Sequence, residues 1–546
     1  MGRVCIDRLD AQNENVSTTL VTTARIVDGT GAPWFRGAVL LDDGEIAEVS
    51  RVPEPSRSAD TIVDVDGDIL APGFIDTHSH SDLQLFADST LAPKIRQGIT
   101  TEMLGQDGFS IAPMHREGGA AEWQDQLAGL AGRVDKEWTW GGVEAYLNAI
   151  DDAGVAPNVG TLVGHGAVRF NVMGMEDSEP TDTELDEMRD LVAESMDEGA
   201  FGLSTALVIT PCSYATTAEL TALASELEPY GRPFVAHIRS ERGDIWNALD
   251  EFVDIGAAAD VPVHLSHFKL GGPPQHGKTD RALALAETAR DRGIDFSADQ
   301  YPYTASNTLL SYVLPPWVHA DGPEQTIEYL QDEEARERIN ADIEHGRIEG
   351  WDNPGAYSGW DNVVIASVES DENTAIEGMS VAALAEQWDT EPVYAVCDLL
   401  AEEELGVSVI NHFIDEDDVR DILASERVNV ITDGLFGGNP HPRVYGAFPR
   451  VLGNYVREAG LLSLEEAVRK MTSLPARSMG LGTKGLIRPG MDADLVVFDP
   501  EIVGSPATYD TPRQYPTGIY HVLVDGEFVV RDGETTGATP GSALRA

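Results

Sequence analysis

Hydrophobic and polar positions follow three different patterns along this chain. From Thr19 to about Leu70, short runs of β-branched residues alternate with Asp-Gly turn signals. The same pattern returns after Gly485, and in both places it predicts antiparallel strands and hairpins. Two β-rich ends around a different middle predict one composite β-sandwich domain, built from residues 1–70 and 481–546.

The middle of the chain, residues 71–480, alternates apolar strands with helical stretches. The strand candidates include Val159–Val163, Gly202–Thr205, Phe234–His237, Val263–His267, Asp295–Gln300 and Val428–Thr432. Repeated βα units predict a parallel sheet, and this number of them predicts a distorted (β/α)8 TIM barrel. A stretch near 322–401, rich in acidic residues, Trp and Gly, fits the alternation poorly and is predicted to be an insertion. The expected fold class is therefore α/β.

Charge narrows the set of partners. The 546 residues carry a net charge of -56, with six Lys and 31 Arg against 93 Asp and Glu. Such a surface repels nucleic acids and anionic membranes, so neither is expected as a partner. The acidic residues are spread along the chain instead of forming one tail. This pattern favours a halophilic protein, because molar salt screens the repulsion.

Cysteine usage and the N-terminal residues bear on the compartment. Cys5, Cys212 and Cys397 are odd in number and widely separated, which predicts no disulfide framework and a reducing environment. Residues 1–18 lack the apolar core of a signal peptide, and no run of 18 apolar residues occurs anywhere. We therefore expect a soluble, cytoplasmic protein. The sequence leaves the oligomeric state open, and a homo-oligomer is compatible with it.

The segment GFIDTHSH, Gly73 to His80, holds the first candidate chemistry. His78 and His80 stand two residues apart after a short apolar run that reads as a strand. Residues i and i+2 of a strand face the same side, so both imidazoles can reach one metal ion. The carboxyl end of a strand is also where barrel enzymes place their active sites. Taken alone, however, two ordinary histidines at a strand end explain the pair equally well.

Three further residues stand at the ends of candidate strands. His237 ends FVAH, His267 ends VHLSH, and Asp433 follows NVIT directly before a glycine. A hydrolytic metal site needs about three protein ligands and an open position for water. Four histidines and one aspartate at strand ends meet this need. The sequence thus predicts a metal-dependent hydrolase with Asp433 as the catalytic general base.

The order of these residues resembles that of the amidohydrolase superfamily, and further strings narrow the resemblance to its D-aminoacylase, or N-acyl-D-amino-acid deacylase, branch. These strings are GQDGFS (105–110), GHGAVR (164–169), HIRSE (237–241), SHFK (266–269), DQYPYTAS (299–306), HPRVYGAFPRVLG (441–453) and KMTSLPA (470–476). The resemblance implies a distorted TIM barrel with a composite β-sandwich and an insertion. It also implies hydrolysis of small N-acyl-D-amino acids to a carboxylate and a free D-amino acid.

The resemblance further implies a metal ligand at Asp107, together with His237 and His267. In this branch a cysteine commonly stands at that position and helps to hold a tightly bound zinc. A carboxylate can also ligate, but it is a harder donor than a thiolate and relaxes the selectivity for zinc. We expect one or two ions, zinc first, with manganese or cobalt as alternatives. The competing interpretation of Asp107 is a helix-capping or loop acid.

The implied mechanism is metal-assisted amide hydrolysis. Asp433 deprotonates a metal-bound water, the water attacks the acyl carbonyl, and Asp433 passes the proton to the leaving amine. The α-carboxylate of the substrate needs a cation, and a tyrosine at a strand end can orient the substrate or stabilise its oxyanion. The candidates for these substrate-binding roles are Lys269, Arg169, Arg443, Tyr301 and Tyr303. Structural salt bridges and simple packing are the competing explanations for the arginines and tyrosines.

Two other functions compete with this one. Cyclic-amide hydrolases, such as hydantoinases and dihydroorotases, share the first histidine pair, but they bridge two metals with a carboxylated barrel lysine, and no candidate strand here ends in lysine. An inactive binding protein on the same fold is disfavoured because the five candidate residues at strand ends are intact. The sequence does not determine which side chain or acyl group is accepted, although the strongly negative charge disfavours substrates with acidic side chains.

Overall fold

The computed structural model describes residues 18–53, 58–134, 136–345, 348 and 351–546. Cys5 and nearly all of the N-terminal segment considered above lie outside the described residues. Cys212 and Cys397 are buried free thiols. None of the helices in the described ranges is long and apolar enough to cross a membrane.

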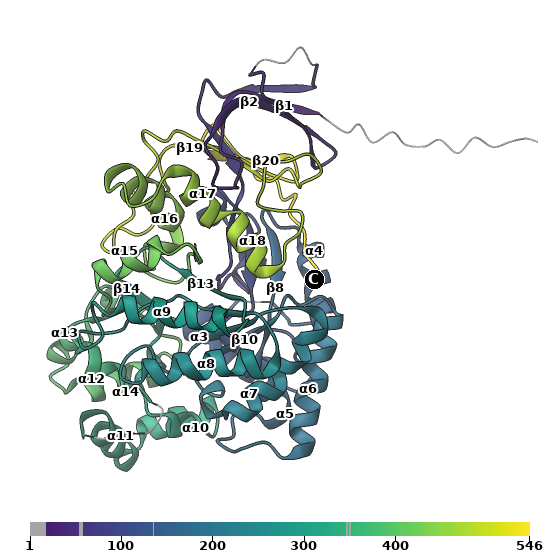
Figure 1. Ribbon diagram of the computed structural model, residues 1–546. Coiled ribbons are helices and arrows are strands. Elements are labelled where there is room, and N and C mark those ends of the chain that lie inside the picture. The colour runs from purple at the N-terminus through teal and green to yellow at the C-terminus, as the bar shows by residue number, and fades with distance from the viewer. Residues whose placement is uncertain (1–17, 54–57, 135, 346–347, 349–350) are drawn as a thin grey trace, which may run out of the picture.

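Both ends of the chain contribute to one nine-stranded sheet, which lies at one end of the molecule (Figure 1). Its strands are β1 (Thr19–Ile26), β2 (Phe35–Asp42), β3 (Glu45–Ser50), β4 (Thr61–Asp64), β5 (Ile69–Pro72), β18 (Leu495–Phe498), β19 (Ile519–Val524), β20 (Glu527–Arg531) and β21 (Glu534–Thr535). They run in the order β21-β20-β19-β18-β5-β1-β2-β3, with β4 beside β1. The two ends meet where β18 pairs antiparallel with β5, and Ile46 donates a hydrogen bond of 2.8 Å to the Met491 carbonyl, which curls the sheet on itself.

Parallel strands form the centre of the molecule. One sheet contains β6 (Phe74–Asp76), β7 (Ile99–Leu104) and β8 (Asn158–Thr161), and the other contains β9 (Val163–Gly164), β10 (Leu203–Ala206), β11 (Phe234–His237), β12 (Val263–Leu265), β13 (Phe296–Gln300) and β17 (Val428–Val430). Only Leu162 separates β8 from β9. Beyond β17, the Asp433 N–H donates to the His78 carbonyl at 2.9 Å, which links the end of the second sheet to the start of the first. This is the strand order of a TIM barrel.

Amphipathic helices cover these strands (Figure 1). They include α3 (Gly119–Ala131), α4 (Val143–Ala153), α5 (His165–Met173), α6 (Asp182–Asp197), α7 (Thr217–Ala224), α8 (Ile245–Ala259), α9 (Thr279–Asp291), α15 (Glu416–Ala424), α16 (Arg443–Arg450), α17 (Leu464–Met471) and α18 (Ser473–Met479). In α8, Leu249, Phe252 and Val253 are buried while Asp250 is exposed, as expected for a helix with one apolar stripe. A capping box between Thr181 and Glu184 starts α6.

The chain leaves the parallel strand order after β13 and rejoins it at β17. Between them, β14 (Ala305–Leu309), β16 (Ser408–His412) and β15 (Val363–Ser367) form a separate antiparallel sheet in the order β14-β16-β15. The helices α10 (Pro323–Gln331), α11 (Glu333–His345), α12 (Pro354–Ser358), α13 (Val381–Gln387) and α14 (Pro392–Glu402) accompany this sheet. Apolar residues of this segment pack into a hydrophobic cluster separate from that of the parallel strands. This segment is wider than the predicted insertion near 322–401, because β14 precedes and β16 follows the helices that made the pattern irregular.

Candidate metal centre

The histidines and aspartates of the predicted site follow the carboxyl ends of parallel strands. They are His78 and His80 after β6, Asp107 after β7, His237 at the end of β11, His267 after β12, and Asp433 after β17. Three of them have left-handed backbone conformations, with φ of 57° at Asp107, 34° at His267 and 49° at Asp433. Such conformations cost about 1–3 kcal/mol each and are typical of functional sites, where surrounding contacts enforce them.

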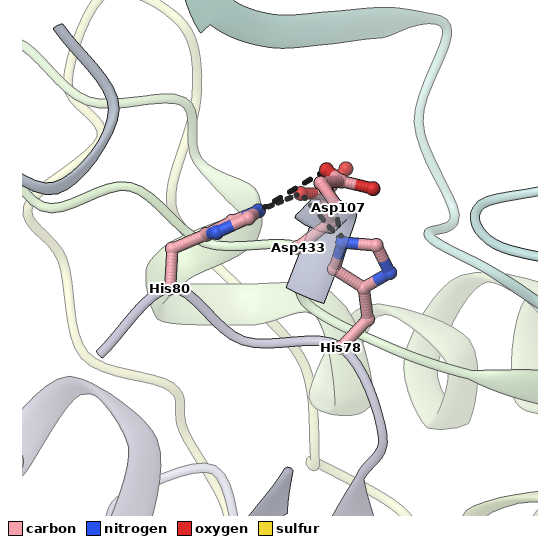
Figure 2. Close-up of side chains that lie close together, drawn as sticks. All are labelled: His78, His80, Asp107 and Asp433. Atoms are coloured by element: carbon pink, nitrogen blue, oxygen red, sulfur yellow. Dashed lines mark ion pairs between the residues drawn. The ribbon is translucent and has the colours of Figure 1, made fainter. Parts of the chain in front are cut away.

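His78, His80, Asp107 and Asp433 form a first group of converging donor atoms (Figure 2). Asp107 Oδ2 lies 3.5 Å from His78 Nε2 and 3.6 Å from His80 Nε2. Asp433 Oδ1 lies 3.6 Å from His78 Nε2 and 3.2 Å from His80 Nε2. All four side chains are buried, so the two imidazoles and two carboxylates face one another out of bulk water.

A second group consists of Asp107, His237 and His267. The other oxygen of the shared carboxylate, Asp107 Oδ1, lies 3.7 Å from His267 Nε2. The rings of His237 and His267 meet edge to face, with centroids 4.4 Å apart. Burial lowers the pKa of His237 to about 3, which keeps its imidazole neutral, as a metal ligand must be. One carboxylate thus points one oxygen at each group.

These donors fit divalent cations. Two ligands about 2.0–2.2 Å from a tetrahedral zinc lie about 3.3–3.6 Å apart, which is close to the spacings observed in both groups. Within these two donor groups, four buried atoms have no hydrogen-bond partner among the described residues, namely His78 Nδ1, His78 Nε2, His80 Nε2 and Asp107 Oδ1. Buried polar atoms rarely remain unsatisfied, and a bound cation would satisfy the last three. The cluster is therefore a candidate site for one or two metal ions.

Buried charges hold the first strand end in place. Lys94 Nζ lies 2.9 Å from both Asp76 Oδ2 and Glu102 Oε1, and it donates to Thr432 Oγ1 at 2.8 Å. Burial lowers the pKa of Lys94, but Asp76 and Glu102 raise it by more, so the side chain remains an ammonium. This lysine thereby connects β6 and β7 to the residue that precedes Asp433.

Asp299, near the end of β13, contacts His78, His264 and His267. Its carboxylate pairs with His264 Nε2 at 2.9 Å and accepts a hydrogen bond from the His267 backbone N–H at 2.5 Å. Its Oδ2 atom also lies 3.9 Å from His78 Nδ1. A carboxylate in this position fixes ring orientation, as partners of metal-binding histidines commonly do. Its position near the end of a strand, at the start of DQYPYTAS, is the sequence signal that could have identified it.

Lys269 reaches the centre, where it is paired with Glu241. The ammonium donates to Glu241 Oε1 and lies 2.7 Å from His267 Nδ1. Glu241 Oε1 also lies 3.2 Å from His267 Nδ1 and 3.6 Å from His237 Nε2. Burial raises the pKa of Glu241, but Lys269 and His237 lower it well below its usual range. The sequence analysis did not single out Glu241, although it stands four residues after His237 in HIRSE.

Arg443 holds the second carboxylate of the first group. Its Nη1 lies 2.9 Å from Asp433 Oδ2, and its Nη2 donates to the Asn307 carbonyl at 3.1 Å. Burial raises the pKa of Asp433, but Arg443 and His78 lower it by a larger amount, so the carboxyl is ionised. The guanidinium also lies 4.5 Å from the ring centre of Tyr301, whose buried hydroxyl has no hydrogen-bond partner among the described residues.

Two predicted substrate-binding residues lie elsewhere. Arg169 makes a two-pronged salt bridge to Glu219, at 2.8 and 2.7 Å, and it does not line the cavity beside the metal donors. Tyr303 is buried against His441, with ring centroids 5.0 Å apart, and it does not line the cavity either. In the structure Arg169 forms a buried salt bridge and Tyr303 packs behind the site, so the structure does not bring these two residues to the cavity with the other candidates.

A cavity opens onto the metal donors. Its polar lining includes Asp107, Glu241, Arg242, Lys269, Tyr301, Asn307 and Asp433, and its apolar lining includes Leu130, Val208, Ile209 and Phe413. Ser306, Asn307 and Thr308 come from β14, so the inserted segment forms one wall. Parallel strands in barrel order, with clustered His and Asp donors beside a cavity at their carboxyl ends, define the class of metal-dependent hydrolases with a TIM-barrel fold.

Comparison with known proteins agrees with this class. Residues 61–530 match the amidohydrolase family, and the chain belongs to that family. It is 34% identical over 527 residues to the D-aminoacylase of Alcaligenes xylosoxydans xylosoxydans, and the match covers 96% of this chain and 97% of that protein.

Two solved structures share the whole fold. One is an N-acyl-D-glutamate deacylase from Bordetella bronchiseptica, complexed with zinc and a phosphonate inhibitor that mimics the tetrahedral intermediate. It has 33% identity and a TM-score of 0.81, and the match covers 97% of this chain and 100% of that one. The other is a D-aminoacylase studied for its binuclear metal centre, with 32% identity, a TM-score of 0.81 and coverage of 97% and 99%. These matches confirm the predicted fold class and the resemblance.

Proposed function

We propose that this chain hydrolyses the amide bond of N-acyl-D-amino acids, releasing a carboxylate and a free D-amino acid. The observation that carries the proposal is the pair of donor groups that share Asp107, next to an ionised Asp433 and two buried cations, Lys269 and Arg443. The preference for the D configuration is transferred from the relatives, whose names specify D-amino acids.

In this proposal His78, His80, Asp107 and Asp433 hold one metal ion, and Asp107, His237 and His267 hold another. Zinc is the first candidate, supported by the zinc in the Bordetella deacylase, with manganese or cobalt as alternatives because Asp107 offers oxygen in place of sulfur. When bound, such an ion supplies Lewis acidity, which activates water and polarises the acyl carbonyl.

Asp433 acts as the general base and then as the general acid. Arg443 holds Oδ2 at 2.9 Å, which fixes the carboxylate and keeps it ionised, while Oδ1 faces His78 and His80. The ionised carboxylate takes a proton from the attacking water and returns it to the leaving amine. The buried surroundings strengthen these charge interactions by excluding water.

Lys269, Arg443 and Tyr301 orient the substrate. The two cations flank the metal donors and suit the α-carboxylate of an amino acid, and the free hydroxyl of Tyr301 suits the acyl oxygen. Each cation already has a carboxylate partner, Glu241 or Asp433. The substrate carboxylate therefore joins existing ion pairs instead of meeting bare charges.

The alternative functions have less support. A cyclic-amide hydrolase with a carboxylated lysine needs a neutral lysine amine between two metals. Lys94 is an ammonium enclosed by Asp76 and Glu102, and Lys269 is paired with Glu241. An inactive binding protein would have no need for three buried donor atoms without hydrogen-bond partners, His78 Nε2, His80 Nε2 and Asp107 Oδ1, that converge at metal-ligand spacing.

The charge and the thiols support proposals about the protein's environment. We infer a halophilic, cytoplasmic protein, because the net charge of -56 suits a surface in molar salt and the buried thiols of Cys212 and Cys397 suit a reducing compartment.

The test is amine release from matched N-acetyl-D- and N-acetyl-L-amino acids in molar salt, with zinc, manganese or cobalt returned to chelator-stripped protein. We expect metal-dependent release from the D series. Turnover of hydantoins or dihydropyrimidines without turnover of any acyl-amino acid would refute the proposal.

A further inference from the structure

One cation in the cavity makes no direct ion pair, although Asp352 and Glu241 act on it from farther away. Arg242 follows Glu241 in the loop after β11, lines the same cavity as the metal donors, and is only 4% exposed. No carboxylate oxygen of the described residues lies within 4.0 Å of its guanidinium, whereas Lys269 and Arg443 each have such a partner. Its Nε atom is buried and has no hydrogen-bond partner among the described residues.

The surroundings of Arg242 hold its guanidinium in one place. Nη2 donates to the Tyr312 hydroxyl at 3.0 Å, and the guanidinium carbon lies 4.4 Å from the ring centre of Phe413. The Gln275 side chain binds the Arg242 carbonyl at 2.8 Å. A planar guanidinium that is stacked on a ring and held at one edge keeps its other donors oriented for a planar acceptor such as a carboxylate.

Tyr312 can add a second donor to the same acceptor. Its hydroxyl accepts hydrogen bonds from Arg242 Nη2 and from Asn411 Nδ2, each at 3.0 Å. Both bonds use oxygen lone pairs, so the hydroxyl proton remains to be donated. Tyr312 lines the cavity together with Arg242.

We propose that Arg242 and Tyr312 bind a carboxylate at the end of the substrate's side chain, so that this chain prefers N-acyl-D-glutamate or N-acyl-D-aspartate over neutral N-acyl-D-amino acids. The inference rests on the proposed function. A buried guanidinium that no carboxylate contacts directly is only partly compensated by Asp352 and Glu241, and a substrate carboxylate in contact with it completes the compensation. The α-carboxylate uses Lys269 and Arg443, which leaves Arg242 for the distal one.

The negative charge of the whole chain disfavours acidic substrates, but it acts over a distance. In molar salt the Debye length is about 3 Å, so surface carboxylates contribute little inside the cavity. A buried guanidinium in direct contact is screened much less. The local cation therefore determines the preference.

The test compares kcat/KM for N-acetyl-D-glutamate and its neutral isostere N-acetyl-D-glutamine, and for the aspartate and asparagine pair. We expect the wild-type protein to favour at least one acid over its amide by more than about 10-fold. Arg242→Met should lower this ratio about 10- to 100-fold, the range for a lost hydrogen bond to a charged group. Tyr312→Phe should lower it less.

Arg239→Met is the matched control. Arg239 lies in the same loop, pairs with Glu251 at 2.9 Å and does not line the cavity, so its loss should leave the ratio unchanged. A wild-type ratio near 1 for both pairs, or a ratio that Arg242→Met does not change, would overturn the inference while the deacylase proposal stands. No release from any N-acetyl-D-amino acid, neutral or acidic, would overturn both.

Discussion

Replacing Asp107 with asparagine tests the shared-carboxylate arrangement directly. Asparagine keeps the shape of the side chain but removes the charge and one ligand oxygen. Asp107 Oδ2 lies 3.5 Å from His78 Nε2, and Oδ1 lies 3.7 Å from His267 Nε2, so one substitution affects both donor groups. Without Asp107, the first group keeps His78, His80 and Asp433, while the second keeps only two histidines.

The two groups should therefore respond differently. Three protein ligands are enough for a catalytic zinc site, and two are fewer than such sites use. Since the loss of a residue that merely supports a ligand weakens metal binding about 10- to 100-fold, loss of the ligand itself should weaken the second site by at least that much. The expected zinc content falls from two ions per chain to one.

The assay is elemental analysis of zinc after equilibrium dialysis against a series of zinc concentrations. Asp66→Asn is the control, because Asp66 also precedes a glycine in a left-handed turn, with φ of 48°, but it is exposed and belongs to none of the donor groups. Its zinc content should equal that of the wild type. An Asp107→Asn variant that binds two ions with undiminished affinity would refute the reasoning, and so would a wild-type protein that never binds more than one.

Three further predictions concern the general base, a half-buried acid and the surface. Asp433→Asn should lower kcat about 100- to 10,000-fold in the amine-release assay, the usual contribution of a general base, and near-normal turnover would place the base elsewhere. Burial and the nearby Asp494 raise the pKa of Asp525 to about 6. Above that pH the ionised carboxylate therefore lowers the stability of the folded state. Asp525→Asn should therefore raise the free energy of unfolding by about 1–2 kcal/mol at pH 7.5, after allowance for screening, and this gain should vanish below about pH 4. The control Asp532→Asn, in an exposed turn of the same kind, should change the free energy of unfolding little. An equal gain for Asp525→Asn at both pH values would contradict the assignment. Because the net charge is -56, the unfolding midpoint should rise between 0.1 and 2 M KCl, roughly the range over which the Debye length falls from about 10 Å to below 3 Å, and a midpoint independent of salt would argue against a halophilic surface.

Much of the fold and the outline of the site were predictable from the sequence alone. The period of two at both ends of the chain and the repeated βα pattern between them are local signals, and strand pairing follows from them. The ends of strands are also local, which is why the positions of His78, His80, His237, His267 and Asp433 pointed to one site. In a parallel barrel every strand brings its carboxyl end to the same face, so sequence order was sufficient to group these residues.

The tertiary structure alone decided how charges pair. Arginine and lysine look alike in sequence whether they bind substrate or a neighbouring carboxylate, because their partners lie far away along the chain. Arg169 pairs with Glu219 and lies outside the cavity lining, while Arg443 pairs with Asp433 beside the cavity. Arg242, which the sequence analysis did not single out, forms no direct ion pair with a carboxylate of the described residues.

The sequence by itself determined which residues stand at strand ends, since backbone hydrogen bonding and side-chain alternation act over a few residues. Only the folded chain decided that Asp107 belongs to both donor groups, that Glu241 contacts both Lys269 and His267, and that β14 of the inserted segment forms one wall of the cavity. These contacts depend on distances of a few ångströms between distant parts of the chain. Such distances are set by how the strands, helices and insertion pack together, which no local pattern records.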